Sequence, residues 1–208
     1  MADRADAAEA AIGQAPGRLR TVQAFVNTLD IEESTDELAS TAALTAWLTG
    51  AGLLDSAESE PARESDLRLA LDLRESLRGV LRAHAGHGPP RDPASGLGTI
   101  AARLPVRLEA SPEGRIEPVP AGSGVTAALT RVVLVAVEAE ALGTWSRLKA
   151  CGADDCQWAF YDRSPTRNGC WCSMQICGAR AKSRAYRERR ARRLPTASRS
   201  GRSAAAGA

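Results

Sequence analysis

Aromatic residues are scarce in this sequence, with four Trp, two Tyr and two Phe among 208 residues. Because 44% of the residues are nonetheless hydrophobic, we expect one sizeable core built mainly from Leu, Val and Ala. No apolar run approaches the ~20 residues that a membrane-spanning helix needs. The first sixteen residues carry acidic side chains and no apolar stretch of the kind found in secretory signals. We therefore expect a cytoplasmic protein without a membrane partner, in which thiols stay reduced.

Cysteines are few, but four of the five form two equally spaced pairs. Cys151 and Cys156 enclose four residues, Cys172 and Cys177 enclose four more, and fifteen residues separate the pairs. Four thiolates from two such Cys-x4-Cys segments can bind one Zn²⁺ ion in tetrahedral geometry. Since protein sulfurs fill all four positions, the spacing predicts structural zinc that folds a small finger, and disfavours catalytic zinc. The alternative interpretation is four buried free thiols.

The fifth cysteine, Cys170, lies outside this spacing. It could replace a ligand, react with oxidants as part of a redox switch, or have no role in the site. We favour the last interpretation, because proximity to a zinc site is a weak guide to thiol reactivity.

Local sequence signals predict the structure of the finger. Gly and Asp between the first two cysteines favour a tight turn, and residues 158–162 alternate between apolar and polar as in a strand. Ser, Pro, Asn and Gly in residues 163–169 predict a turn back into a second strand through Trp171. An Ala-, Arg- and Glu-rich helix should then run from Cys177 to about Arg193. This order, a knuckle, a hairpin and a helix that begins at a ligand, is typical of treble-clef-like zinc fingers.

These residues resemble the CGNR zinc-finger family. The positions that match its pattern, besides the four cysteines, are Trp158, Phe160, Asp162, Ser164, Trp171, Ser173, Met174, Gly178, Arg180 and Lys182. The sequence departs at Ala179, where the family has Asn, and at Gly169-Cys170, where a basic pair usually precedes the Trp. Segments 25–30, 47–53 and 73–78 are similar to landmarks of the ABATE domain that precedes this finger in family members. The resemblance implies a stress-linked bacterial transcription regulator.

Charge is distributed unevenly along the chain. From Gly178 onward there are ten Lys or Arg and one acidic residue, a net +9, whereas the preceding residues hold 17 basic and 24 acidic side chains, a net −7. A basic segment of this kind is typical of proteins that bind a polyanion, and we expect the polyanion to be DNA. The residues predicted to contact nucleic acid are Arg180, Lys182, Arg184 and Arg187. The alternatives are a solvated tail, or a finger that binds RNA or an acidic protein.

The overall pattern predicts an α+β protein, with a mainly helical body that carries a small β-hairpin and is followed by the finger. Helices are expected over 22–29, 41–48, 65–85 and 126–145, and a hairpin over 106–117. The expected domains are a disordered N-terminus (1–19), an ABATE-like α/β domain (20–148), the finger with its basic helix (149–193) and a flexible tail (194–208). The body would form a homodimer or sense a small-molecule effector whose identity the sequence does not reveal.

Other candidate residues are interpreted structurally. His84 and His87 lie at a helix end without a Glu between them, which predicts a surface feature in place of a metal site. Asp162 and Ser164 have no histidine nearby to act as a base, so we expect them to hold a turn through backbone amides. The four Trp residues are expected to pack in the core or the finger, the acidic run 30–37 to be solvated, and the protein not to be an enzyme.

Overall fold

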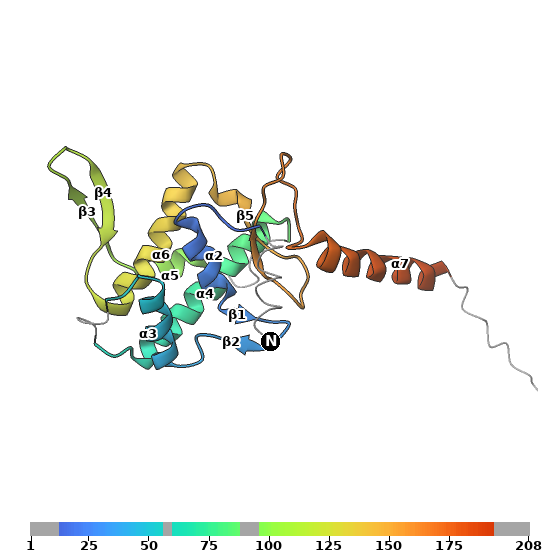
Figure 1. Ribbon diagram of the computed structural model, residues 1–208, viewed down its shortest axis with the longest axis horizontal. Coiled ribbons are helices and arrows are strands. Elements are labelled where there is room, and N and C mark those ends of the chain that lie inside the picture. The colour runs from blue at the N-terminus through green and yellow to red at the C-terminus, as the bar shows by residue number, and fades with distance from the viewer. Residues whose placement is uncertain (1–12, 56–59, 88–95, 194–208) are drawn as a thin grey trace, which may run out of the picture.

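The computed structural model describes residues 13–55, 60–87 and 96–193. Helices enclose one core, and a single helix projects from one end of the molecule (Figure 1). The elements in chain order are α2 (Leu19–Asn27), β1 (Leu29–Asp30), β2 (Thr35–Asp36), α3 (Thr41–Gly50), α4 (Glu64–His84), α5 (Leu97–Ala101), β3 (Val106–Ala110), β4 (Ile116–Pro120), α6 (Gly124–Ala141), a 3₁₀ turn (Trp145–Arg147), β5 (Leu148–Ala150), β6 (Ala159–Tyr161), a π turn (Met174–Gly178) and α7 (Ala179–Arg193). The predicted α+β class is confirmed.

Helix α4 crosses the core and contributes its apolar stripe. Leu73, Leu77 and Leu81 are fully buried, as their spacing on one helix face predicts. The helix begins one residue before the predicted N-cap, and the carboxylate of Asp66 in its first turn accepts the backbone N–H of Arg63 at 2.8 Å. The core also contains residues from α2, α3, α6 and the β5–β6 hairpin.

Helix α6 forms in spite of its run of β-branched residues. Leu129 and Val132 are fully buried, so the β-branched side chains that lower helix propensity are compensated by packing in the core. The predicted helix is therefore confirmed. No helix in the described residues combines the length and the apolar character that a membrane crossing requires.

The predicted hairpin is also confirmed, as β3 and β4, which pair in antiparallel register from Val106↔Pro120 to Ala110↔Ile116. Its turn closes through a hydrogen bond from the N–H of Gly114 to the carbonyl of Ser111 at 2.9 Å. This hairpin projects from the body at the end opposite α7 (Figure 1).

The acidic run 30–37, expected to be solvated, is only partly so. Strands β1 and β2 pair within it, and both carboxylate oxygens of Asp36 accept hydrogen bonds from the buried Arg74 at 2.6 and 2.8 Å. The hydrogen bond from Arg74 lowers the pKa of Asp36 below its usual value, against the opposing effect of burial. The expectation of a solvated run was wrong at this position, because the buried guanidinium of Arg74 needs a carboxylate partner and the half-buried Asp36 supplies it.

The expectation of disorder concerned both ends of the chain. Residues 1–12 and 194–208, for which disorder was expected, lie outside the described residues. Residues 13–19 were also expected to be disordered, but Ala15 is fully buried and the carbonyl of Gly13 accepts the N–H of Tyr161 at 2.7 Å. This segment therefore contacts β6 through a backbone hydrogen bond and is part of the packed body.

Candidate metal centre and basic helix

The first cysteine pair lies in the loop of a short β-hairpin. Strand β5 pairs with β6 from Leu148↔Tyr161 to Ala150↔Ala159, and the loop between them contains Cys151 and Cys156. The predicted partner of this strand, a second strand through Trp171, was wrong. Residues 162–173 contain no strand and are held by side-chain hydrogen bonds instead.

The second cysteine pair lies where the chain turns into the basic helix. Ser173 caps the π turn, and its hydroxyl accepts the N–H of Ile176 at 3.3 Å. Cys177 lies in this turn and is 1% exposed, while α7 begins two residues later. The predicted helix is present, but a wider π turn precedes its first α-helical residue and contains Cys177. The Cys177 sulfur lies close to those of the first cysteine pair in the β5–β6 loop, residues 151–158, which we call the knuckle.

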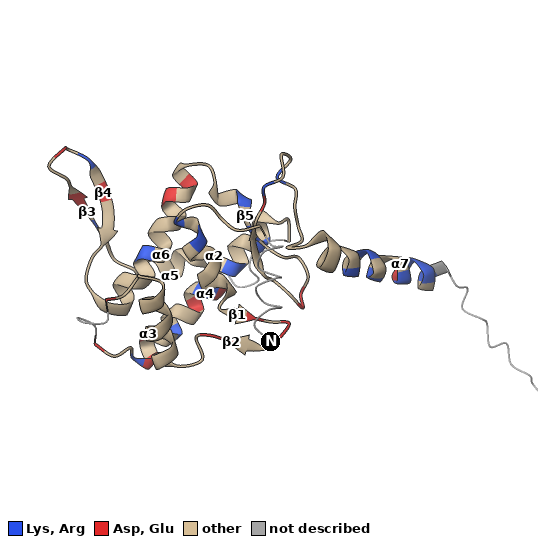
Figure 2. Cartoon of the chain, viewed as in Figure 1, with Lys and Arg blue, Asp and Glu red and all other residues tan. Residues whose placement is uncertain are grey.

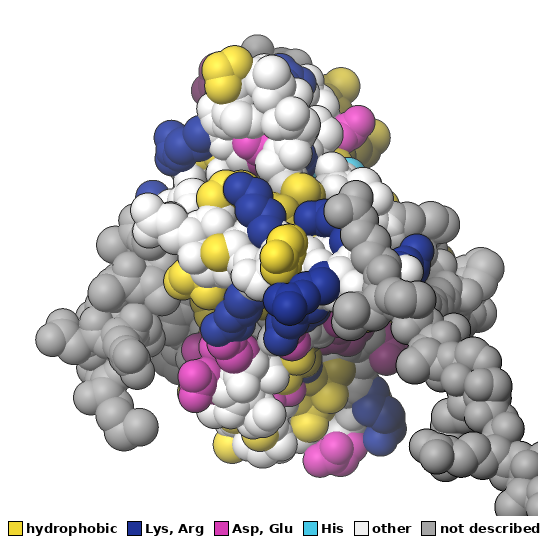
Figure 3. Space-filling model, turned by 90° about the vertical axis from the view of Figure 1, so that its right-hand side faces the viewer, with side chains coloured by type: hydrophobic (Ala, Val, Ile, Leu, Met, Phe, Trp, Pro, Cys, Tyr) yellow, Lys and Arg dark blue, Asp and Glu magenta, His cyan; other side chains and the backbone are white. Residues whose placement is uncertain are grey.

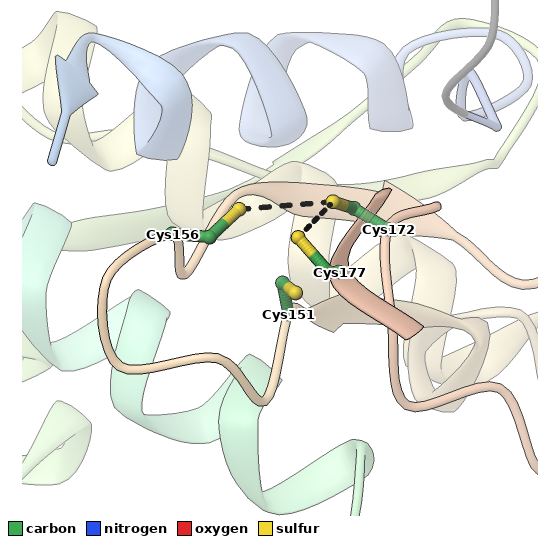
Figure 4. A group of neighbouring side chains, drawn as sticks. All are labelled: Cys151, Cys156, Cys172 and Cys177. Atoms are coloured by element: carbon green, nitrogen blue, oxygen red, sulfur yellow. Dashed lines mark hydrogen bonds between the residues drawn. The ribbon is translucent and has the colours of Figure 1, made fainter. Parts of the chain in front are cut away.

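The fold brings all four predicted ligands together (Figure 4). The sulfurs of Cys151, Cys156, Cys172 and Cys177 all lie within 4.8 Å of one another. Cys172 Sγ lies 3.7 Å from Cys156 Sγ and 3.7 Å from Cys177 Sγ. Sulfurs placed tetrahedrally about 2.3 Å from one zinc ion would lie about 3.8 Å apart. The sulfur cluster therefore has the size and the donor chemistry for one structural Zn²⁺ ion.

The thiols also show why this cluster favours a cation. Hydrogen bonds from the Cys156 and Cys172 thiols lower the pKa of Cys151 to about 2, while burial opposes the shift. The pKa values of Cys156 and Cys172 are raised, first because each donates its proton to Cys151. Four thiolates without a cation would repel one another, so metal binding replaces the shared protons with positive charge.

A buried ion pair holds the loop that follows β6. Lys149 Nζ lies 2.8 Å from the Asp162 carboxylate, and the two side chains are 2% and 4% exposed. The same ammonium donates to the carbonyls of Arg167 and Gly169 at 2.6 and 3.0 Å. The Asp162 carboxylate accepts the N–H groups of Ser164 and Gly169 at 2.9 and 2.8 Å. The predicted turn-holding role of Asp162 is confirmed, whereas Ser164 takes part through its backbone and not its side chain.

Burial raises the pKa of Asp162, but the hydrogen bonds from Lys149, Ser164 and Gly169 outweigh it and hold that pKa below its usual range. A Cβ atom at Gly169 would lie 3.0 Å from the carboxylate. This close approach explains why the departure from the family pattern at Gly169 suits this loop, since any larger residue would push the carboxylate aside.

Arg78 of α4 links the β5–β6 loop to the body through hydrogen bonds to two backbone carbonyls. Its side chain is 2% exposed, and it donates to the carbonyl of Gln157 at 3.1 Å and to that of Val26 at 2.7 Å. Gln157 directly follows Cys156 and has a left-handed backbone with φ of 54°. Arg78 therefore fixes the residue beside a metal ligand against the end of α2.

Asn27 and His84 fasten the β5–β6 hairpin in the same way. The Asn27 amide accepts the N–H of Ala159 at 2.7 Å and donates to its carbonyl at 3.1 Å. Nδ1 of His84 lies 2.9 Å from the carbonyl of Leu148, and its ring meets that of Trp145 edge to face. The expectation that His84 is only a surface feature was therefore wrong, because the end of α4 packs on the hairpin.

His87 is exposed and lies close to the knuckle. Its ring centroid is 6.0 Å from that of Trp171, and a Cβ atom at Gly152 would overlap its ring. Trp158 and Trp171 pack against the cysteine cluster, while Trp145 is buried in the main core and Trp47 packs against it. The packing role expected for all four Trp residues is confirmed.

Cys170 lies outside the cluster of four sulfurs, and the preference for a residue without a role stays a prediction. It is half-buried, and its carbonyl accepts the N–H of Gly152 at 2.9 Å, which links the two cysteine-bearing segments through the backbone.

The predicted nucleic-acid residues all lie on α7, where Figure 2 shows Lys and Arg positions in blue along the projecting helix. Arg180, Arg184 and Arg187 line one open depression of about 530 Å³, whereas Lys182 does not contribute to it. Arg180 pairs with Glu32 of the β1–β2 loop at 2.7 Å, and Arg184 Nη1 lies 3.6 Å from the Asp155 carboxylate. Both ion pairs are about half exposed. Ala179, at the family's Asn position, is exposed and lines the same depression.

The knuckle, the second cysteine pair and the helix that follows it define a zinc-finger protein. Residues 147–190 match the family model of the CGNR zinc finger. Residues 19–147, more than half of the chain, match the ABATE model, described as "Putative stress-induced transcription regulator", and the chain belongs to that family. No curated protein matches the chain.

Proposed function

We propose that this protein is a DNA-binding transcription regulator whose finger uses zinc structurally and whose helix α7 contacts DNA. The observation that carries the proposal is the charge and the placement of α7. It has eight Lys or Arg residues and one Glu in fifteen positions, a net +7, and it projects away from the body (Figure 1). The proposal assigns no catalytic activity.

A helix of this composition is poorly stabilised by itself. Cations recur three and four residues apart along α7, and like charges at these spacings repel one another. The described side chains of α7 are exposed except for the half-buried Ala181 and Ala185, so little apolar packing offsets the repulsion. A polyanion would neutralise these charges, which supports nucleic acid as the partner.

The geometry favours one face of α7 for the contact. At 3.6 residues per turn, Arg180, Arg184 and Arg187 lie on one side of the helix, and Lys182 lies on the other. Figure 3, which looks at the end of the molecule bearing α7, shows Lys and Arg side chains gathered around a few apolar ones. Ile176, which is 46% exposed, lies beside the arginines in the depression and offers an apolar contact to a base or sugar.

The metal centre positions this face. Cys177 is a ligand position and lies in the turn from which α7 continues, so zinc would fix the first turn of the helix relative to the body. Zinc itself supplies the tetrahedral crosslink that holds the finger folded. Arginine suits the proposed contact because its guanidinium can bind phosphate or guanine with two parallel hydrogen bonds.

The test compares two triple variants of the zinc-loaded protein for binding to duplex DNA by fluorescence anisotropy. Arg180, Arg184 and Arg187→Ala removes the proposed contact face. Lys182, Arg189 and Arg192→Ala removes the same charge from the other sides of the same helix. We expect the first variant to lose affinity at least tenfold more than the second.

Equal losses would mean that α7 acts only through its total charge. No DNA binding by the unmodified protein, even at low salt, would overturn the proposal and turn attention to RNA or an acidic protein as the partner of α7.

A further inference from the structure

We infer that the protein pairs with a second copy of itself through the free edge of strand β3. Among the described residues, β3 pairs with β4 and with no other strand. All five residues of β3 are exposed. The inference rests on this hairpin alone and is independent of the proposed role of α7.

One face of the hairpin is apolar throughout. Side chains alternate along each strand, and the register places six apolar residues on the same face. These residues are Val106, Leu108, Ala110, Ile116, Pro118 and Pro120. Leu108 and Ile116 are 71% and 70% exposed. An isolated two-stranded hairpin is marginally stable in water, and a contiguous exposed apolar face marks an interaction site.

The two edges of the hairpin differ in their capacity to pair. Hydrogen bonds join Ser111 N–H to the carbonyl of Arg115, and Ala121 N–H to that of Pro105, at the two ends of the ladder. Because such bonds alternate along antiparallel strands, the N–H groups of Val106, Leu108 and Ala110 point away from β4.

On β4 the equivalent outward positions include Pro118 and Pro120, which have no N–H to offer. The edge of β4 is therefore blocked, while that of β3 presents a row of free donors and acceptors, the usual template for strand addition.

The charge pattern of β3 is complementary to itself. In an antiparallel β3–β3 pair centred on Leu108, Arg107 of one copy lies opposite Glu109 of the other. Glu109 of the first copy likewise lies opposite Arg107 of the second. In the monomer Arg107 Nε lies 2.9 Å from the Glu109 carboxylate along the same strand, and Arg107 Nη1 also donates to the carbonyl of Pro120 at 3.0 Å.

The same register places Val106 opposite Ala110 and Leu108 opposite its own copy on the apolar face. Opposite charges and apolar pairs directly across strands each stabilise a sheet. A contact of this kind follows a twofold axis and is isologous. This self-complementarity is what favours a second copy over an unrelated protein.

The position of the hairpin leaves the basic helix free in such a dimer. The hairpin and α7 project from opposite ends of the molecule (Figure 1). Strand addition alone buries less surface than a standard protein interface, so we expect a weak dimer with micromolar dissociation. The product is a four-stranded sheet with one continuous apolar face.

The first test measures self-association by sedimentation equilibrium across a micromolar to millimolar concentration series, with zinc-loaded protein. Leu108→Pro removes the outward N–H at the centre of the proposed contact without removing a bond within the hairpin. Leu108→Thr keeps that N–H and shortens the side chain. We expect the wild type and the Thr variant to dimerise and the Pro variant to remain monomeric at unchanged helical content. A monomeric wild type, or equal behaviour of the Pro and Thr variants, would overturn the inference.

The second test uses charge complementarity between two different variants. Arg107→Glu and Glu109→Arg each place like charges across the proposed interface, so each variant alone should be monomeric. Mixed together, the two variants place opposite charges across it, although the like-charge pair within each strand remains. We expect the mixture to regain association at least tenfold over either variant alone. A mixture that stays monomeric contradicts pairing through β3.

Discussion

Lys149 places a cation inside the finger, next to the first metal ligand, Cys151. Its ammonium is held by one carboxylate and two carbonyls, and its partner Asp162 is equally buried. Neither charge is exposed to solvent, so each depends on the other to offset the free energy of desolvation. The pair replaces the strand pairing that this loop lacks.

Removing either charge should therefore be costly. We expect Lys149→Met or Asp162→Asn to lower the free energy of unfolding of the zinc-loaded protein by about 3–5 kcal/mol, because each leaves the other partner uncompensated. Chemical denaturation monitored by circular dichroism measures the loss.

The double variant should lose less than the sum of the two single losses, since it leaves no unpaired charge. Arg167→Met, at an exposed position in the same loop, keeps the carbonyl that Lys149 binds, serves as the control and should change little. Losses below about 1 kcal/mol for both single variants would show that the pair does not hold the loop.

The sequence predicted the metal ligands but not the residues that hold them. Cys151 and Cys177 could be found because cysteine spacing reflects tetrahedral geometry directly. Lys149 and Arg78 could not, because a charged residue beside apolar ones normally lies on the solvated side of an element. Apart from the local pair of Arg78 with Glu75, their partners are a distant carboxylate and backbone carbonyls, which have no signature in sequence.

At the scale of elements, α4 joins the body to the finger through Arg78. We expect Arg78→Met to speed transfer of zinc to a colorimetric chelator by ten- to a hundredfold, the usual range when a group that supports a metal ligand is lost. The reason is that the Gln157 carbonyl beside Cys156 loses its partner.

Arg68→Met provides a matched control, since Arg68 lies on the exposed side of the same helix. Equal rates of zinc transfer for the Arg78 and Arg68 variants would contradict this role of α4.

The basic helix makes two ion pairs that compete with the proposed contact. The carboxylate of Glu32 binds Arg180 and that of Asp155 lies beside Arg184, at the guanidinium groups that would bind phosphates in the proposed contact. Because exposed ion pairs contribute about 0–1 kcal/mol each, we expect Glu32→Gln with Asp155→Asn to tighten DNA binding by a few-fold at low salt.

Fluorescence anisotropy with the same duplex measures this gain. The exposed Glu140→Gln with Asp72→Asn removes two charges elsewhere and should have a smaller effect. Weaker binding by the Glu32 and Asp155 variant would show that these carboxylates support the binding conformation of α7.

Whether a segment forms a helix or a strand was easier to predict than which other segment it pairs with. The helices over α4 and α6 and the β3–β4 hairpin follow from periodicity and turn residues, which are local properties. The strand at residues 158–162 was also predicted in nearly the right place, as β6. Its pairing with β5 was missed, because Asp162 ends the strand by binding nearby amides, and the next segment turns away.

At the scale of the whole molecule, the strands that lead into and out of the first cysteine pair belong to the main core, while the cysteines themselves form a second, smaller cluster. Leu148 and Ala150 of β5 and Ala159 of β6 are fully buried in the same cluster as Phe25 of α2. The hairpin that bears the first cysteine pair is therefore part of the body's packing.

Removal of zinc should accordingly destabilise more than the finger. We expect a chelator to lower the melting temperature of the whole chain in one cooperative transition, because the loss of the metal loosens a hairpin that belongs to the main core. Calorimetry with and without zinc gives the comparison. A body transition unchanged by the chelator would show that the finger folds as a separate unit.

The central claim, that a zinc-ordered basic helix binds DNA, is tested most directly by the salt dependence of duplex binding by the zinc-loaded protein. If about six phosphates are neutralised, the logarithm of the association constant should fall with the logarithm of salt concentration at a slope near −5. The Arg180, Arg184 and Arg187→Ala variant should give a slope shallower by about 3. A slope near zero for the wild type, or one left unchanged by these substitutions, would contradict the account.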